Sequence, residues 1–375
     1  MELRKLDIKE HGKTRKLWEQ IFTEDSREFL DYYYFLKTRD NEIYVIEEDN
    51  EIRSMLQLNP YMLHIGEATV PADYIIAVAT DERYRKQGYM RRLLCRAMQD
   101  MYNKKQIITF LMPAAEAIYT PYDFRFVYKQ KIAEISGDSS EMKVELVQAG
   151  IQDAAMLAEF YEENFAERYQ ICTYRDESYY QTILFEQQSE HGGIMMMKSS
   201  GKLVGTFCYA NEDGFMIREP LYLDGYKEEF EKAVFALKKE QKTVTVYAAQ
   251  DDGDTVEDKP MIMVRILHLE MLLPVLKVRE GETVDCSFAV LDPILTQNSR
   301  IFRIRGGQER TRQIEVTETE DSEGVLTIGA FTSLLSGYKS IEEIQKEEDV
   351  FLTDRLAEEL RKIEPFDQVF INEVV

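Results

Sequence analysis

Residues 73–102 combine an apolar run, a basic loop and an amphipathic stretch in an order that strongly constrains the fold. The run DYIIAVAT (73–80) has the β-branched and aromatic content of a strand. Apolar residues after Gly88 recur at helical spacing and predict a helix over 88–102. A strand that runs through a loop into a helix brings the unpaired backbone N–H groups of that helix to the loop.

The loop RYRKQGYMRR (83–92) holds five basic residues in a chain whose net charge is −23. A helix N-terminus carries partial positive charge, and a glycine lets a ligand approach the backbone, so the loop predicts a phosphate or pyrophosphate site. The alternative is a solvated helix start that is basic by chance, although basic side chains there oppose the helix dipole. The loop contains neither a G-x-G-x-x-G fingerprint nor a Walker-type GK[ST] motif.

The rest of the 375-residue chain divides into three units. Residues 1–140 show the order β-α-α-β-β-β-α-β-α-β, which predicts an α+β domain. Residues 141–278 open again with a strand and a helix, and residues 251–259 predict an acidic, solvated loop. Residues 279–375 show strands followed by helices. We therefore expect three domains, over 1–140, 141–278 and 279–375.

Charge and composition exclude several classes of protein. The excess of acid lies almost wholly in residues 141–375, a field that repels nucleic acid and attracts cations. No apolar run reaches the roughly 18 residues of a membrane span. The charged N-terminus has no signal core, and the four cysteines are scattered, so we expect a cytoplasmic protein with reduced thiols. The four histidines are equally scattered, and we expect no metal site.

At the loop, the sequence resembles a known family. Arg85-Lys86-Gln87-Gly88-Tyr89-Met90 resembles the acetyl-CoA loop of GNAT-type N-acetyltransferases, and residues 75–80 resemble the splayed central strand of that fold. The departure is Met90, where most members have Gly or Ala. One branch, the enhanced-intracellular-survival (Eis) family, also carries a bulky residue there. The block over residues 114–124 resembles that family, with Asp123 where Gly is usual.

The resemblance continues through the remaining units. Residues 259–266 resemble the Eis-family strand that enters the third domain, and residues 290–293 with Asn298 resemble the start of a sterol-carrier-protein-like domain. The implied fold class is α+β, with tandem GNAT domains, the second degenerate, followed by a sterol-carrier-protein-like α/β domain. The resemblance also implies a hexamer and acetyl-CoA as co-substrate. The acetyl-CoA site it implies consists of Ile76, Val78, Arg83, Arg85, Lys86, Gly88, Tyr89, Met90 and Arg91.

The resemblance assigns two catalytic groups. Tyr119 matches the tyrosine that faces the sulfur of coenzyme A, and a phenol with a pKa near 10 can donate a proton to a developing thiolate. Without the resemblance, Tyr119 would be one of 22 tyrosines, most of them structural. The family's terminal carboxylate reaches the active site, a role that falls here to Val375, either as a base or as a group that positions the amine.

The expected acceptor is a small cationic amine or a lysine side chain. Glu24 and Asp25 lie between two predicted helices, where the family lines an amine pocket, although such residues also serve as helix caps. The sequence thus predicts an acetyl-CoA-dependent N-acetyltransferase. The alternative is a non-catalytic acyl-CoA or lipid-binding sensor, which would need neither Tyr119 nor a buried C-terminus.

Overall fold

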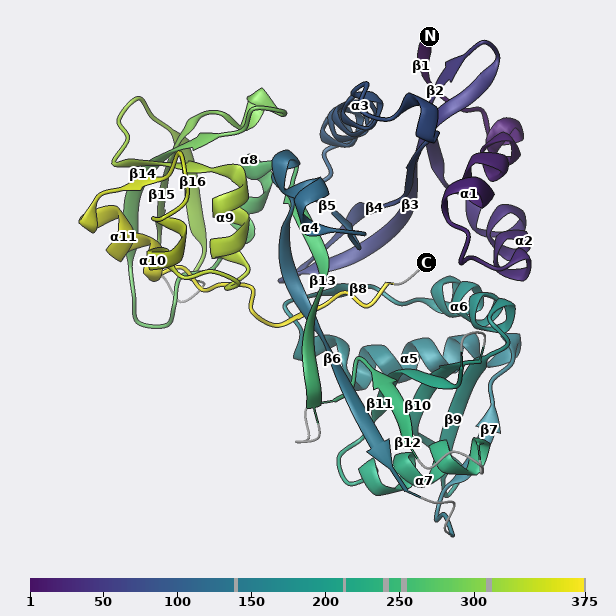
Figure 1. The fold of residues 1–375 in the computed structure, drawn as a ribbon. Helices are drawn as coiled ribbons and strands as arrows, with labels where there is room; N and C mark the ends of the chain where they lie inside the picture. The colour runs from purple at the N-terminus through teal and green to yellow at the C-terminus, as the bar shows by residue number, and fades with distance from the viewer. Residues whose placement is uncertain (138–140, 212–213, 239–242, 251–254, 308–311, 374–375) are drawn as a thin grey trace.

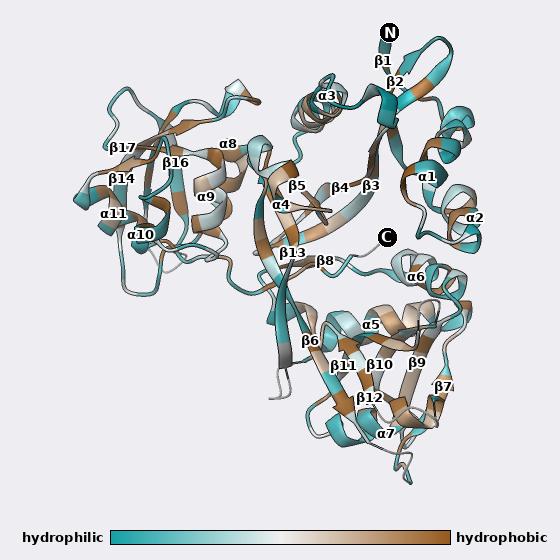
Figure 2. Cartoon of the chain, in the orientation of Figure 1, coloured by the Kyte–Doolittle hydropathy of each residue, from teal (hydrophilic) through white to brown (hydrophobic). Residues whose placement is uncertain are grey.

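The computed structural model describes residues 1–375 except 138–140, 212–213, 239–242, 251–254, 308–311 and 374–375. The chain forms three lobes around a shared centre (Figure 1). Hydrophobic residues concentrate along the strands, whereas hydrophilic residues cover the outer helices and loops (Figure 2). No described helix combines the length and the hydrophobicity that crossing a lipid bilayer requires.

The first lobe contains the strand, loop and helix on which the sequence analysis depends. The predicted helix is α3, and the apolar positions predicted for its inner face are buried against the sheet. The predicted strands are also present. The elements of this lobe are β1 (Glu2–Lys5), α1 (Arg15–Ile21), α2 (Arg27–Phe35), β2 (Glu42–Glu48), β3 (Glu51–Ile65), β4 (Ala68–Thr80), α3 (Tyr89–Asn103), β5 (Ile108–Leu111) and α4 (Glu116–Tyr119).

Two long strands, β6 (Arg125–Ser136) and β13 (Thr255–Ile266), join the first lobe to the second. Strand β13 lies between β5 and β6, so the described strands form one continuous 14-stranded sheet through both lobes. The prediction of a loop at 251–259 is wrong for residues 255–259, which belong to β13, although residues 257–259 are solvent-exposed as expected. Residues 251–254 lie outside the described part. In this strand Asp258 lies opposite Lys131 of β6, and such a cross-strand pair of opposite charge favours pairing.

The second lobe repeats the strand-then-helix opening of the first. Its strands β9, β10 and β11 pair in chain order as an antiparallel meander. The sequence analysis missed β8 and α6, and α6 proves central to the site. The elements of this lobe are β7 (Glu145–Gln148), α5 (Ala154–Asn164), β8 (Ile171–Thr173), α6 (Glu177–Ser189), β9 (Gly193–Ser199), β10 (Lys202–Ala210), β11 (Met216–Tyr222), α7 (Lys227–Leu237) and β12 (Thr243–Tyr247).

The third lobe is a five-stranded sheet covered by helices. A fully buried ion pair, Arg265 Nη2 to Asp292 Oδ1 at 2.6 Å, ties it to the end of β13. The amide of Asn298 donates to the other Asp292 oxygen at 3.0 Å. The elements of this lobe are α8 (Leu269–Leu272), β14 (Val284–Leu291), β15 (Ile301–Gly306), β16 (Ile314–Glu318), β17 (Gly324–Thr327), α9 (Ile328–Leu335), α10 (Ile341–Ile344), β18 (Phe351–Leu352) and α11 (Asp354–Arg361).

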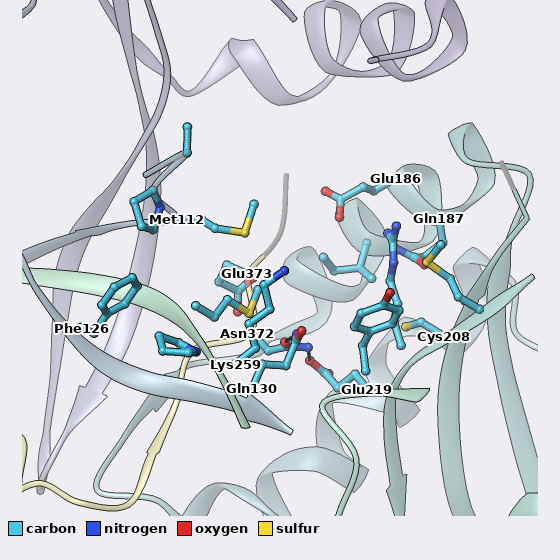
Figure 3. Close-up of a pocket in the computed structure, with 18 of the residues that line it drawn as sticks. Met112, Phe126, Gln130, Glu186, Gln187, Cys208, Glu219, Lys259, Asn372 and Glu373 are labelled. Carbon is cyan, nitrogen blue, oxygen red and sulfur yellow. Dashed lines mark hydrogen bonds between the residues drawn. The ribbon is translucent and has the colours of Figure 1, made fainter. Parts of the chain in front are cut away.

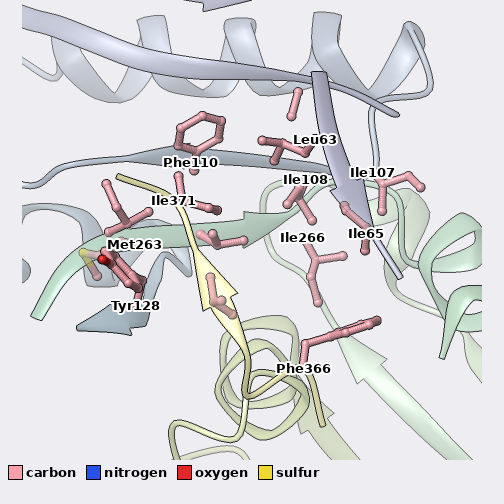
Figure 4. Close-up of a cluster of buried hydrophobic side chains, with 14 of the residues drawn as sticks. Leu63, Ile65, Ile107, Ile108, Phe110, Tyr128, Met263, Ile266, Phe366 and Ile371 are labelled. Atoms are coloured by element: carbon pink, nitrogen blue, oxygen red, sulfur yellow. The ribbon is translucent and has the colours of Figure 1, made fainter. Parts of the chain in front are cut away.

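The C-terminal tail returns from the third lobe to the centre of the molecule (Figure 1). Its strand β19 (Val369–Phe370) pairs with β8, which in turn pairs with β3. Ile371 is fully buried in the core that all three lobes share. Burying a side chain of this size contributes roughly 1.5–3 kcal/mol. Figure 4 shows this core, with labelled residues Leu63, Ile65, Ile107, Ile108, Phe110, Tyr128, Met263, Ile266, Phe366 and Ile371.

Candidate active site

Strands β4 and β5 separate close to the middle of the first lobe. They are parallel neighbours, and Tyr74 of β4 is paired with Phe110 of β5. Beyond this point β4 keeps its partner β3 but shows a bulge, because Ala77 has a φ of 51° and the register with β3 shifts there. Ile76 and Val78 lie in this stretch and are half-buried. The parting strands leave this stretch of β4 without a β5 partner, and the binding role predicted for Ile76 and Val78 stays a prediction.

The basic loop ends at Gly88, the N-cap residue of α3. Gly88 has a φ of +78°, and a Cβ placed on it would meet no atom within 4 Å. The left-handed backbone conformation at this position therefore favours glycine. The missing side chain also leaves open space above the N-terminus of α3. Lys86 also has a positive φ, of 62°. This geometry fits a pyrophosphate that approaches the backbone N–H groups of α3.

The basic side chains of the loop differ in their partners. Arg83 forms a 2.8 Å ion pair with Asp81, and Arg85 lies 3.5 Å from Glu82. Lys86 and Arg91 are exposed and form no ion pair with any described residue. These two cations are therefore the most available to an anionic ligand. We infer that the loop's effective positive charge is smaller than its five basic residues suggest.

The last two residues of the predicted loop site lie at the start of α3. The Tyr89 ring is buried, and its hydroxyl donates to Glu48 at 3.2 Å. Met90 is half-buried and packs against the main hydrophobic core. Both side chains thus face the protein, so any contact with an anion would come from their backbone N–H groups.

Tyr119 is the last residue of the short helix α4. Its side chain is 7% exposed, and its ring meets that of Phe124 edge to face at a centroid distance of 6.0 Å. Burial raises the pKa of Tyr119 to about 12. The phenol is therefore fully protonated at neutral pH, as a proton donor must be.

A cavity of about 620 Å³ lies between the first and second lobes, next to the start of α4 (Figure 3). Residues 112–116 form one wall, α6 and β11 form the opposite wall, and the C-terminal tail enters between them. Acidic side chains recur around it. Those that line it are Glu116, Glu186, Glu219 and Glu373, and the basic ones are Arg218 and Lys259.

Glu186 and Glu373 are the two buried carboxylates of this cavity, 3% and 2% exposed. The Tyr32 hydroxyl donates to Glu186 at 3.2 Å, and the Tyr179 hydroxyl donates to Glu373 at 3.1 Å. Burial is the main cause that raises the pKa of both carboxyls, and that of Glu186 rises to about 7. The sequence analysis missed both residues. The sequence does contain a sign of where Glu186 points. It lies seven residues after Tyr179 and three after Ile183, so the three residues share one face of a helix.

Arg175 holds the C-terminal tail against the second lobe. It is fully buried, contacts Glu219 through both terminal nitrogens, and lies 3.9 Å from Glu373. The tail adds a further contact, because the Asn372 amide donates to Glu219 at 2.8 Å. The positive charge of Arg175 offsets the free-energy cost of removing two carboxylates from water. This cluster fixes where the tail enters the cavity.

Two further predicted residues lie between α1 and α2. Asp25 accepts a 2.6 Å hydrogen bond from the indole of Trp18, so it has a structural contact. Glu24 is exposed on the loop between α1 and α2, and Ser26 rather than Asp25 caps α2. Val375 lies outside the described residues. Among the described residues, no group of three or more His, Cys, Asp or Glu side chains is placed to hold a metal ion.

Two family descriptions match the sequence. Residues 2–127 match "Acetyltransferase (GNAT) domain", and residues 269–374 match "Sterol carrier protein domain". The first match contains the splayed strand, the loop and Tyr119. The second contains the third lobe and the C-terminal tail. No curated protein matches the sequence.

Solved structures of the same fold cover the whole chain. A protein from Enterococcus faecalis V583, described as a probable N-acyltransferase, is 18% identical over 100% of this chain and 99% of its own, with a TM-score of 0.86. A GCN5-related N-acetyltransferase from Anabaena variabilis is 16% identical over 100% of both chains, with a TM-score of 0.81. Eis1 from Mycobacterium abscessus is 13% identical over 100% of both chains, with a TM-score of 0.75.

These matches confirm the predicted fold class and the resemblance drawn from the loop. The mixed α and β architecture, the GNAT domain and the C-terminal sterol carrier protein domain all agree with it. The chain thus contains a GNAT acetyltransferase domain at its N-terminal end and a sterol carrier protein domain at its C-terminal end, and it shares the overall fold of Eis1.

Proposed function

We propose that the protein transfers an acetyl group from acetyl-CoA to a primary amine of a small cationic acceptor or a lysine side chain. The observation that carries this proposal is the cavity lined by four glutamates next to α4. An acidic, partly enclosed cavity stabilises a positive charge, because water screens the attraction less there than in solution. The chain's net charge of −23 draws cations toward it.

The acetyl-CoA side of the site is assigned to the parted strands and the basic loop. The β4 backbone at Ile76 and Val78 would bond the pantetheine arm, and the N–H groups at Gly88, Tyr89 and Met90 would hold the pyrophosphate. Lys86 and Arg91 would add charge-assisted hydrogen bonds, which are stronger than neutral ones. Arg83 and Arg85 would contribute less, because Asp81 and Glu82 already engage them.

Tyr119 is proposed as the general acid. The neutral amine attacks the thioester carbonyl carbon, so that a C–N bond forms and the C–S bond then breaks. The leaving thiolate takes the phenolic proton of Tyr119. The new amide loses its extra proton, which restores the phenol. Because burial keeps Tyr119 protonated at neutral pH, the donor is available in each cycle.

The experiment that tests this function measures free thiol released from acetyl-CoA with a panel of amines. The panel contains a polyamine, an aminoglycoside, a lysine peptide and, as a matched control, the hydroxyl analogue of one amine. We expect release with at least one cationic amine and none with the hydroxyl analogue. Coenzyme A binding without release for every amine would contradict the proposal and favour the acyl-CoA sensor.

A further inference from the structure

The proposed function leaves open how the acceptor, which is an ammonium ion in water at neutral pH, loses its proton before attack. Val375, which the family resemblance implies as a base or as a group that positions the amine, lies outside the described residues. We propose that Glu186, on helix α6 of the second lobe, binds the acceptor ammonium and accepts that proton. The inference rests on the proposed function, and it assigns a catalytic residue to the lobe that lacks a basic Arg-x-x-Gly loop.

The position of Glu186 supports this role. Its side chain lines the cavity on the side opposite residues 112–116, which lead into α4 and Tyr119 (Figure 3). Glu186 is 3% exposed, so a cation beside it would be largely removed from water. The Tyr32 hydroxyl, from α2 of the first lobe, donates to one carboxylate oxygen at 3.2 Å. A bound amine would therefore be held between the two lobes.

The other cavity carboxylates are less suited to take a proton. Glu219 is engaged by Arg175 and by the Asn372 amide. Glu373 lies 3.9 Å from Arg175 and accepts from Tyr179. Glu116 is exposed. Glu186 is the one buried carboxylate of the four that forms no ion pair with a described residue.

Charged groups from several elements face Glu186. Lys37, which follows α2, lowers its pKa, but the Lys37 amine donates to the Tyr61 hydroxyl at 2.9 Å. Arg218 of β11 also lowers it, but Arg218 is ion-paired with Glu190. Glu190 and Glu373 raise it. Burial is the largest effect, and the resulting pKa of about 7 suits a base that works near neutral pH.

A neighbouring phenol connects Glu186 to the other catalytic group. Tyr74 lies on β4 where the strands part, and its pKa is raised by burial, then by Glu373, and to a smaller extent by Tyr119 and Glu186. Glu186 and Tyr119 are thus both close enough to the Tyr74 phenol to raise its pKa. Glu186 would take one proton from the ammonium and release it to solvent after transfer, so that atoms and charge balance.

The test compares Glu186→Gln with Glu177→Gln, the same change at an exposed position of the same helix. Thiol release with the best amine is measured from pH 5.5 to 9. In the wild type kcat/KM should rise about tenfold per pH unit up to pH 7 and then level off. Glu186→Gln should lower kcat/KM by about 10²–10⁴-fold at pH 7.5 and abolish the rise of kcat/KM below pH 7. Glu177→Gln should match the wild type.

Three outcomes separate the possible failures. The inference is supported if Glu186→Gln loses both the rate and the rise of kcat/KM below pH 7, while it keeps its coenzyme A affinity and melts no lower than the wild type. If Glu186→Gln keeps a kcat/KM within threefold of wild type and the same rise below pH 7, the inference about Glu186 is wrong and the proposed function is unaffected. If the wild type releases no thiol with any amine, the proposed function fails and the inference fails with it. Glu186→Asp, which keeps the carboxylate, should recover part of the rate if Gln loses it.

Discussion

Tyr74 of β4 and Phe110 of β5 lie opposite each other with stacked rings, 5.1 Å between centroids and 23° between planes, at the point where the two parallel strands part. The stack closes the inner end of the opening between the strands. Both rings are buried in the core shared by the lobes, so the end of the opening is rigid. The cavity between the lobes begins two residues beyond Phe110, at Met112.

Replacing Tyr119 with Phe removes the proposed proton donor and keeps the buried ring. We expect kcat to fall by about 10²–10⁴-fold, with coenzyme A affinity unchanged. Steady-state thiol release and calorimetric binding of coenzyme A measure the two effects. Tyr122→Phe, three residues after Tyr119 in the 3₁₀ turn that follows α4, is the matched control and should keep its activity. Equal activity in both variants would remove Tyr119 from the mechanism.

Gly88→Ala tests whether the open space above α3 holds an anion. The φ of +78° makes alanine unfavourable by about 1 kcal/mol, and the added methyl group would occupy the approach to the backbone. Gly201 has a φ of +77° and equally open surroundings, but it lies in the turn between β9 and β10. Both alanine variants should lose similar stability, whereas only Gly88→Ala should weaken coenzyme A binding, by about tenfold. Equal coenzyme A affinity in the two variants would argue against the loop site.

The pKa of Glu186 also predicts how stability depends on pH. Burial raises this pKa from the ordinary 4.5 to about 7, so between those pH values the folded state holds a proton that the unfolded state has released. The contribution of this group to the free energy of unfolding therefore falls as the pH rises through that range. Glu186→Gln should be as stable as wild type near pH 4.5 and about 3 kcal/mol more stable at pH 8.

Urea unfolding at several pH values, with Glu177→Gln as control, measures this difference. A constant difference between Glu186→Gln and wild type across the range would show that the carboxyl titrates alike in both states. The result is independent of turnover, so it tests the environment of Glu186 even where no acceptor is present.

Arg175→Met should destabilise the protein strongly. The change leaves Glu219 and the buried Glu373 without their cation, and breaking such a pair from one side costs about 3–5 kcal/mol. Arg168→Met, at an exposed arginine whose guanidinium stacks on Phe165 at 4.6 Å, should cost less than about 1 kcal/mol. Chemical denaturation compares the two. A similar small loss in both variants would mean that Arg175 does not anchor the tail.

The sequence predicted the local elements well and the contacts between distant segments poorly. The strand at 73–80, the glycine at the start of α3 and the burial of its apolar face follow from local patterns. Strand β13 was partly mistaken for a loop because its charged residues gain from pairing with β6, a partner that is far away in the sequence. Periodicity along one segment carries no information about such a partner.

The same limit explains which site residues were found. Gly88 was predicted from its loop and Tyr119 from the family resemblance of its short block, and both assignments stay predictions. Glu186 and Arg175 have their roles because α6, β11 and the tail meet, and isolated polar residues give little sign of burial in a sequence. Asp25 was predicted as a substrate group, and its contact with Trp18 shows an additional structural role.

The measurement that tests the central claim most directly follows the acetyl group itself. The protein is incubated with acetyl-CoA that carries a ¹³C-labelled acetyl carbonyl and with each amine of the panel, and the products are analysed by mass spectrometry and NMR. The account predicts one labelled amide on a cationic amine for each free thiol, and less than about one hundredth of that rate with Tyr119→Phe. Thiol release without a labelled amide, or a labelled amide at the wild-type rate with Tyr119→Phe, would contradict it.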